Sequence, residues 1–253
     1  MNGCIRGSRR QISTSSLRHT LWSFMDTPEP SSVYRYAQDH LLDEPPQIAQ
    51  IRQSAVSQNP SEAQKMISPL QGAFLAHLVC TQGAARVLEL GCYKGYSACW
   101  LAHGLLSQRS QGSPCLWTCE RDREIAQVAQ QNIKDAGYSS IAQVVPKAAQ
   151  DVLESWDSAI KLDMVFIDAN KAAYKSYYDT ILDRSLLSEG GQIIVDNVLL
   201  HGRVHTAPDA SAESKKLTLA QKINDFNRHV AEDSRTTQTL LPIFDGLLLV
   251  RKK

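Results

Sequence analysis

The sequence contains no long apolar run and no block of charges of one sign. Its hydrophobic stretches are short and interrupted by charge or glycine, whereas a membrane-spanning helix needs about 20 consecutive apolar residues. The 27 basic and 26 acidic residues leave a formal net charge of +1, so the chain lacks the basic footprint of a nucleic-acid or anionic-membrane binder. We therefore expect a soluble protein whose partner is a small molecule, with neither nucleic acid nor membrane involved.

Several catalytic motifs are missing as well. The chain has no Gly-x-Gly-x-x-Gly turn of a nicotinamide dehydrogenase, no Gly-Lys-Ser/Thr ending of a phosphate-binding loop, and no Gly-x-Ser-x-Gly of a hydrolase. His201 and His205 lack the adjacent glutamate and the helical context of a metalloprotease, because Gly202 lies between them. Dehydrogenase, hydrolase and metalloprotease interpretations are therefore disfavoured.

The six cysteines are scattered, and most lie in apolar segments that are typical of helices or strands. This pattern favours buried, reduced thiols of an intracellular protein over a disulfide framework. Cys115 and Cys119 fall on one face of a single predicted strand, too far apart along it to share a tetrahedral ion. We expect no zinc site.

Residues 1–25 differ in composition from the rest of the chain. They carry arginine and serine but no acidic residue, as mitochondrial targeting peptides do, and residues 10–13 (RQIS) resemble a matrix-protease cleavage context. A disordered tail, or sequence upstream of a natural start at Met25, explains the same composition. We expect an N-terminal extension over 1–25 and one catalytic domain over 26–253, in the cytoplasm or the mitochondrial matrix.

Beyond residue 30, strand-like runs alternate with helical patterns. Two short helices separated by Pro45-Pro46 and a helix over 69–80 come first. The strand-like runs are 86–90, 115–120, 143–145, 162–168, 192–195, 239–243 and 246–250, and helical stretches at 96–106, 123–136, 150–156 and 174–187 separate the first five. Such alternation predicts a parallel sheet with helices on both faces. The last two runs are too close for a crossover and predict an antiparallel hairpin. The expected fold is α/β: a single doubly wound, mostly parallel sheet of about seven strands.

A glycine-containing turn follows the first strand. Residues 89–97 read ELGCYKGYS, and glycine there lets the backbone turn sharply beside a ligand while the helix start offers unpaired N–H groups. On its own, such a turn need not do more than connect a strand to a helix. Glu120 ends the next strand, where a carboxylate can accept hydrogen bonds from a ribose diol. Alone, Glu120 can equally be a helix N-cap, but both features together predict a nucleoside-containing cofactor.

Oxygen-bearing side chains follow the fourth and fifth strands. Asp168 ends one run, and Asp196 and Asn197 end the next, so we expect them to converge in the crevice where α/β sheets bind ligands. Two carboxylates and an amide oxygen form an incomplete hard shell that suits Mg²⁺, although a single aspartate at a strand end is commonly a turn former. Lys171 lies three residues past Asp168, where it is either within reach of a metal-bound hydroxyl or on a solvated helix face.

Together these motifs resemble the cation-dependent class I O-methyltransferases of the catechol and caffeoyl-coenzyme A type, and the resemblance extends over about residues 31–253. The residues that carry it are 66–72 (MISPLQG), 88–97 (LELGCYKGYS), 166–171 (FIDANK), Tyr174, 177–179 (YYD), 190–191 (GG), 196–199 (DNVL) and 241–247 (LPIFDGL).

The resemblance implies a Rossmann-like S-adenosylmethionine (SAM) methyltransferase fold. It also implies metal-dependent methyl transfer to one hydroxyl of a vicinal-dihydroxy aromatic acceptor of the catechol, hydroxycinnamoyl or flavonoid kind. Asp168, Asp196 and Asn197 would bind the metal, Mg²⁺ by preference, and Lys171 would be the catalytic base. Implied cofactor contacts come from Glu89, Gly91, Cys92, Tyr93, Ser97, Glu120, Ala149 and Asp168. A homodimer is expected, since related enzymes are often dimers.

The alternative from another functional class is a catalytically idle SAM-binding protein that acts through a partner. Such a protein would have a damaged metal or lysine position, which this sequence does not have. Three departures from the family pattern fall elsewhere. Asn170 stands where many relatives have aspartate, Leu200-His201 where many have tryptophan, and Phe244 where a small residue is common. We expect these positions to shape the acceptor pocket.

Overall fold

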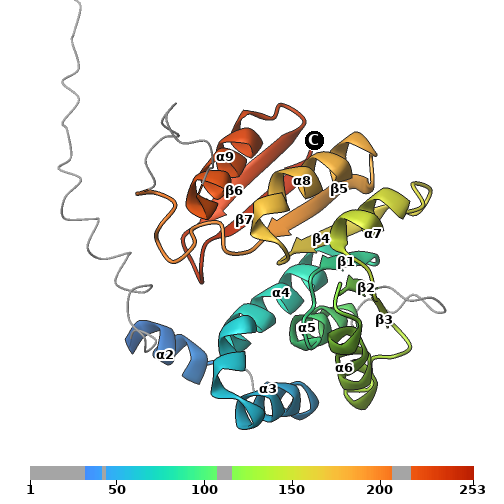
Figure 1. The fold of residues 1–253 in the computed structure, drawn as a ribbon, viewed down its shortest axis with the longest axis vertical. Helices are drawn as coiled ribbons and strands as arrows, with labels where there is room; N and C mark the ends of the chain where they lie inside the picture. Colours follow the sequence, from blue (N-terminus) through green and yellow to red (C-terminus); the bar gives the residue numbers. More distant parts are fainter. Residues whose placement is uncertain (1–31, 42–43, 107–115, 207–217) are drawn as a thin grey trace, which may run out of the picture.

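The computed structural model describes residues 32–41, 44–106, 116–206 and 218–253. The extension expected over residues 1–25 lies outside them. The described chain forms one sheet of seven strands in the order β3-β2-β1-β4-β5-β7-β6 (Figure 1). The strands are β1 (Val87–Leu90), β2 (Leu116–Cys119), β3 (Ala142–Val145), β4 (Leu162–Ile167), β5 (Leu187–Val195), β6 (Thr236–Leu241) and β7 (Leu247–Lys252).

The first five strands run parallel, whereas β7 is antiparallel to both β5 and β6. The prediction of a doubly wound, mostly parallel sheet closed by an antiparallel hairpin is confirmed. β1 lies at the centre of the order, between β2 and β4. Since the chain winds away from β1 in both directions, a ligand crevice is expected at the carboxyl ends of β1 and β4.

Helices cover both faces of the sheet (Figure 1). On one face, side chains from the strands share a buried cluster with α3 (Pro46–Gln58), α4 (Pro69–Gln82), α5 (Tyr96–Leu105) and α6 (Arg123–Asp135). On the other face the buried cluster includes residues of α7 (Ala149–Ser155), α8 (Tyr174–Asp183) and α9 (Leu219–Glu232). The other helical elements within the described ranges are α2 (Ser32–Asp39), η1 (Pro60–Lys65) and η3 (Lys171–Ala173).

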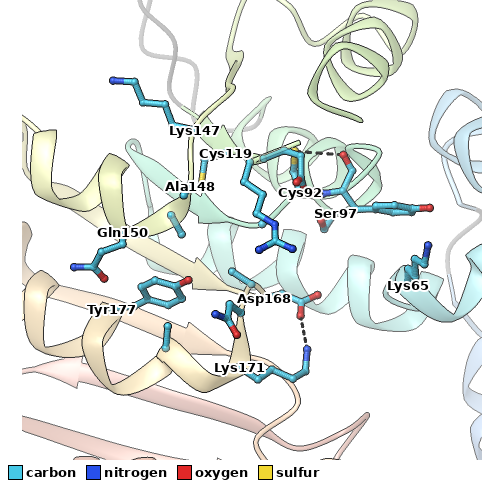
Figure 2. A pocket seen from close by; sticks show the side chains of 18 of the residues that line it. Lys65, Cys92, Ser97, Cys119, Lys147, Ala148, Gln150, Asp168, Lys171 and Tyr177 are labelled. Atoms are coloured by element: carbon cyan, nitrogen blue, oxygen red, sulfur yellow. Dashed lines mark hydrogen bonds and ion pairs between the residues drawn. The ribbon is translucent and has the colours of Figure 1, made fainter. Parts of the chain in front are cut away.

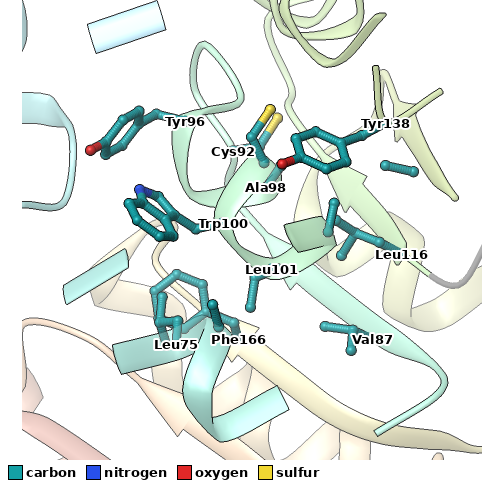
Figure 3. Close-up of a cluster of buried hydrophobic side chains, with 14 of the residues drawn as sticks. Leu75, Val87, Cys92, Tyr96, Ala98, Trp100, Leu101, Leu116, Tyr138 and Phe166 are labelled. Atoms are coloured by element: carbon teal, nitrogen blue, oxygen red, sulfur yellow. The ribbon is translucent and has the colours of Figure 1, made fainter. Parts of the chain in front are cut away.

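The near-continuous apolar character of the central strands follows from this two-sided burial. Val87 belongs to the α3–α6 side and Leu88 to the α7–α9 side, because successive side chains of a strand point to opposite faces. Figure 3 shows the first of these cores, where Leu75 of α4 and Trp100 of α5 pack near Phe166 of β4. The central strands are therefore covered on both faces, and their ends are held in place from both sides.

Local sequence signals determine where several helices begin and end. Ser68 caps α4 by accepting a hydrogen bond from the Gln71 backbone N–H at 3.2 Å, and Gly83 ends that helix in the left-handed conformation at φ 62°. α9 begins with a capping box in which Thr218 and Gln221 bond reciprocally. In the described part of the chain, no helix combines the length and apolar character needed to cross a membrane.

Candidate functional site

A cavity of about 920 Å³ opens at the carboxyl ends of the central strands. Eight of the residues predicted for the site line it: Gly91, Cys92, Tyr93, Ser97, Glu120, Ala149, Asp168 and Lys171. Figure 2 shows Asp168 and Lys171 facing each other on one side of this space. Glu89, Asp196 and Asn197, also predicted, do not form part of the lining.

The β1–α5 turn needs glycine for both conformation and space. Gly91 adopts φ 90°, and a Cβ there would lie 2.4 Å from the backbone oxygen of Asp168, closer than any contact tolerates. The backbone N–H groups of Gly91 and Cys92 both donate to the Cys119 carbonyl at 3.1 Å. The turn is therefore fixed against the ends of β2 and β4, where its backbone borders the cavity.

Glu120 is a cavity residue and not a helix cap. Its carboxylate accepts hydrogen bonds from the backbone N–H of Tyr93 at 3.2 Å and of Asp122 at 3.0 Å. The N-cap of α6 is instead Asp122, which accepts from the backbone N–H groups of Glu124 and Ile125. Glu120 thus connects the two loops that border the cavity and presents a carboxylate to it.

Glu89 lies beneath the turn instead of on the cavity wall. It is fully buried on the α3–α6 face, accepts a hydrogen bond from the Thr118 hydroxyl and lies beside that of Ser97. Burial raises the pKa of Glu89 to about 7. One of its carboxylate oxygens has no hydrogen-bond partner within the described residues, so Glu89 retains a free acceptor close to Ser97.

The two predicted metal-binding aspartates come from adjacent strand ends. The Asp168 backbone N–H donates to the Leu90 carbonyl and that of Asp196 to the Ile167 carbonyl, each at 3.0 Å. The Asp196 carboxyl is buried and that of Asp168 is half-buried, and desolvation raises the pKa of each. The charge of Asp168 raises the pKa of Asp196 further, to about 7. The pair is therefore close enough to repel, and a bound cation would relieve that repulsion.

Asn197 adopts φ 58°, and its backbone N–H donates to Asp196 at 2.8 Å. Its side-chain Nδ2 donates to Asp245 at 3.0 Å, which leaves the amide oxygen for another contact. Nearby, Gln71 of α4 lowers the pKa of Asp196, yet its buried Nε2 has no aligned hydrogen bond within the described chain. Gln71 therefore lies close to the Asp196 carboxyl.

The donor set is compatible with a hard divalent cation. No cluster of three or more His, Cys, Asp or Glu side chains suited to a metal occurs among the residues described, so a metal site here has to include the amide. Two carboxylates and an amide oxygen leave coordination positions for water or acceptor oxygens, as Mg²⁺ prefers. Asp168, Asp196 and Asn197 are the residues that would hold such an ion.

Lys171 begins the η3 turn, which Asn170 caps by accepting from the Ala172 backbone N–H at 3.2 Å. The Lys171 Nζ lies 3.4 Å from Asp168 Oδ1, and 26% of its side chain is exposed. Lys171 is thus a lining residue in contact with a half-buried carboxylate and not a lysine on a solvated helix face. Asn170, one of the departures from the family pattern, lines the same cavity.

Sequence reasoning did not identify several cationic and aromatic lining residues, namely Lys65, Arg121, Lys147 and Tyr177. Figure 2 shows Lys65 on the opposite side of the cavity from Tyr177. The Lys65 ammonium lies 5.2 Å from the centre of the Tyr93 ring, within the range of a cation–π contact. Two signals were available, because Lys65 directly precedes the 66–72 motif and Arg121 directly follows Glu120.

Comparison with known proteins agrees with this geometry. A family model described as O-methyltransferase matches residues 38–253. O-methyltransferase ankF of Aspergillus thermomutatus is 31% identical, covering 88% of this chain and 93% of that protein. A catechol O-methyltransferase of Niastella koreensis is also 31% identical, over 87% of this chain and 92% of its own.

Among solved structures, the SAH-bound methyltransferase PaMTH1 of Podospora anserina matches with a TM-score of 0.76 and 26% identity. That match covers 98% of this chain and all of the other. Sequence and fold agree over the same span, which includes the glycine turn, Glu120, the paired aspartates and Lys171. The chain therefore belongs to the O-methyltransferase family.

Proposed function

We propose that this O-methyltransferase transfers the methyl group of SAM to one hydroxyl of a vicinal-dihydroxy aromatic acceptor, with a divalent cation, most suitably Mg²⁺, at the site. One observation carries the proposal. The cavity bordered by the glycine turn and Glu120 also contains Asp168 and Lys171, and Asp196 lies at the adjacent strand end. This arrangement supports a nucleoside pocket and a cation site in one crevice.

The donor side of the proposal rests on the shape and polarity of the cavity. About 920 Å³ is enough for a nucleoside-sized ligand together with part of an acceptor. Glu120 supplies a carboxylate that can accept hydrogen bonds from ribose hydroxyls, and the turn at Gly91 lets the backbone approach the ligand closely. The relative PaMTH1 was solved with SAH bound, which supports a cofactor of this class.

The acceptor side rests on oxygen ligation and an apolar wall. A vicinal diol offers two oxygens to one cation, which matches the open positions left by two aspartates and an amide. Phe244 lies with its ring centre 6.0 Å from that of Phe74 on α4, and Phe244 directly precedes Asp245 in the loop that contacts Asn197. An aromatic acceptor suits such a wall, and the name of the Niastella koreensis relative is consistent with a catechol.

The reaction forms one oxygen–carbon bond and breaks one sulfur–carbon bond, giving a methyl ether, S-adenosylhomocysteine and a proton. A divalent cation, when bound, lowers the pKa of a coordinated hydroxyl. Lys171 lies beside Asp168 at the edge of this site and takes up the hydroxyl proton at Nζ. Asp168, Asp196 and Asn197 would hold the cation, and Phe74 and Phe244 would orient the ring of the acceptor.

The test is a methyl-transfer screen over catechols, hydroxycinnamoyl thioesters and flavonoids, with and without Mg²⁺ after treatment with EDTA. We expect transfer to at least one vicinal diol, loss of turnover on chelation, and recovery with Mg²⁺ or in part with Mn²⁺. Full activity in excess EDTA would refute the proposal that turnover requires a divalent cation. Tight SAM binding without transfer to any diol would refute the acceptor class and favour a catalytically idle SAM-binding protein.

A further inference from the structure

Two loops at the carboxyl edge of the sheet are joined by Asp245. The first follows β5 and contains Asn197 and His201, and the second is the β6–β7 turn at residues 242–246. Their backbones bond directly, since the Val198 N–H donates to the Gly246 carbonyl at 3.1 Å and the Leu199 N–H to the Asp245 carbonyl at 3.0 Å. The position of one loop therefore determines the position of the other.

The Asp245 side chain reinforces this connection with both of its oxygens. Oδ2 accepts from Asn197 Nδ2 at 3.0 Å, and Oδ1 accepts from the backbone N–H of His201. Only 12% of the side chain is exposed. Asn197 and His201 both adopt left-handed backbone conformations, at φ 58° and 52°, which residues other than glycine rarely hold without support. Asp245 supplies that support from the opposite loop.

The hydrogen bond to Asp245 also determines which end of the Asn197 amide faces the site. An amide carries one acceptor oxygen and one donor nitrogen, whereas an ionised carboxylate can only accept. Nδ2 must therefore point to Asp245, and Oδ1 must occupy the other end of the planar amide. A cation requires an oxygen there, because an NH₂ group in the same place would repel it.

We infer that Asp245 is a positioning residue that holds Asn197 as an oxygen ligand for the divalent cation. This inference rests on the proposed function, because it requires the cation. Asp245 acts through Asn197, because its oxygens accept the Asn197 Nδ2–H and the backbone N–H of His201. Mutation of a residue that orients a metal ligand in this way typically lowers metal affinity by about 10–100-fold.

Reversing the polarity of the pair tests the inference. In Asp245→Asn, the new amide oxygen still accepts from the His201 N–H, so its NH₂ faces Asn197. The Asn197 amide must then flip and present its own NH₂ to the cation. In Asp245→Asn combined with Asn197→Asp, the amide at position 245 donates to a carboxylate at position 197. The hydrogen bond is restored with its direction reversed, and an oxygen again faces the site.

The measurement is Mn²⁺ affinity of the full chain without acceptor, obtained from the free-ion signal in electron paramagnetic resonance. We expect Asp245→Asn to weaken Mn²⁺ binding by at least about 10-fold, and the double variant to recover to within a few-fold of wild type. SAH affinity and the thermal unfolding midpoint, measured on all variants, report loss of loop structure separately.

Equal Mn²⁺ affinity in wild type and Asp245→Asn would overturn the inference and leave the proposed function standing. So would a double variant that stays as weak as Asp245→Asn, because a role limited to anchoring the His201 loop predicts no rescue. A wild-type chain that binds no Mn²⁺ would overturn the cation of the proposed function, and the inference with it.

Discussion

Lys171 is the residue whose chemistry can be tested most directly. If its Nζ accepts the hydroxyl proton, Lys171→Ala should lower the single-turnover rate of methyl transfer by roughly 10²–10⁴-fold, with SAM affinity nearly unchanged. Lys171→Arg should rescue little, because a guanidinium remains protonated. Lys175→Ala is the matched control, since Lys175 lies one helical turn away, pairs with Asp179 and is 53% exposed. Near-normal rates in both Lys171 variants would assign the proton to solvent instead.

Glu89 provides a pH test of the same site. Its folded-state pKa of about 7 lies above the ordinary 4.5, so the native state holds this proton more tightly than the unfolded chain does. The contribution of Glu89 to stability is therefore full below about pH 4.5 and is lost as pH rises through about 7. Without cofactor, Glu89→Gln should gain stability relative to wild type over that interval, by up to about 3 kcal/mol.

Thermal unfolding of both proteins between about pH 4.5 and 8 measures this difference, with Glu232→Gln on the surface of α9 as the control. The variant has no carboxyl to ionise, so its advantage should grow with pH. A difference between Glu89→Gln and wild type that does not change with pH would mean that the buried carboxyl does not titrate in this range.

Individual site residues could be predicted where local sequence position determines their place. Asp168 and Asp196 each follow a buried strand, so their positions after these strands were enough to predict that they lie close together. Gln71 and Asp245 were not predicted as site residues, because their roles depend on tertiary packing. Asp245 contacts Asn197 across 48 residues of chain. No local pattern indicates that a β-hairpin turn returns beside the fifth strand.

At the level of secondary-structure elements, the β1–α5 turn determines the geometry of the cofactor side. Gly91→Ala should weaken SAM binding and lower the free energy of unfolding by roughly 1–3 kcal/mol, because its Cβ meets the Asp168 carbonyl and its φ is positive. Gly137→Ala has a comparable φ of 81° with no atom within 4 Å of the added Cβ. It controls for backbone strain alone, and isothermal titration with SAH compares the two. Equal losses in both variants would contradict a role for the close approach.

Most elements were predicted from periodicity, and the errors have identifiable causes. β5 begins at Leu187, five residues before the predicted run, because Gly190 and Gly191 look like a break but are accommodated by an irregularity in the pairing with β4. β6 begins at Thr236, before the predicted run at 239–243. The start was missed because this edge strand has little apolar periodicity. α9 was missed, although its capping box and the spacing of Ile223, Phe226 and Val230 indicated an amphipathic helix.

Considered as a whole, the molecule links its N-terminal helices to the cavity through a partly buried polar cluster. Glu44 accepts hydrogen bonds from Arg52 of α3 and from the hydroxyl of Tyr96, the first residue of α5. Tyr96 is almost fully buried and also lines the cavity. Tyr34 of α2 donates to Ser68, the N-cap of α4. The segment before the sheet therefore contributes directly to the wall of the site.

Two truncations test how far this contribution extends. A chain that begins at residue 26 keeps α2 and Glu44, so it should unfold within about 2 °C of the full chain and bind SAM equally well. A chain that begins at residue 46 lacks both and leaves the Tyr96 hydroxyl and the Arg52 guanidinium without Glu44. A buried polar group without its partner costs about 1–3 kcal/mol, so the second chain should unfold roughly 5–10 °C lower and bind SAM more weakly.

Glu44→Gln in the full chain separates the effect of this cluster from that of α2 packing, since it keeps the helix and weakens only the hydrogen bonds. If the chain from residue 46 matched the full chain in both measurements, the N-terminal helices would be dispensable for the site; if the chain from residue 26 already lost SAM affinity, the catalytic unit would extend beyond the predicted domain.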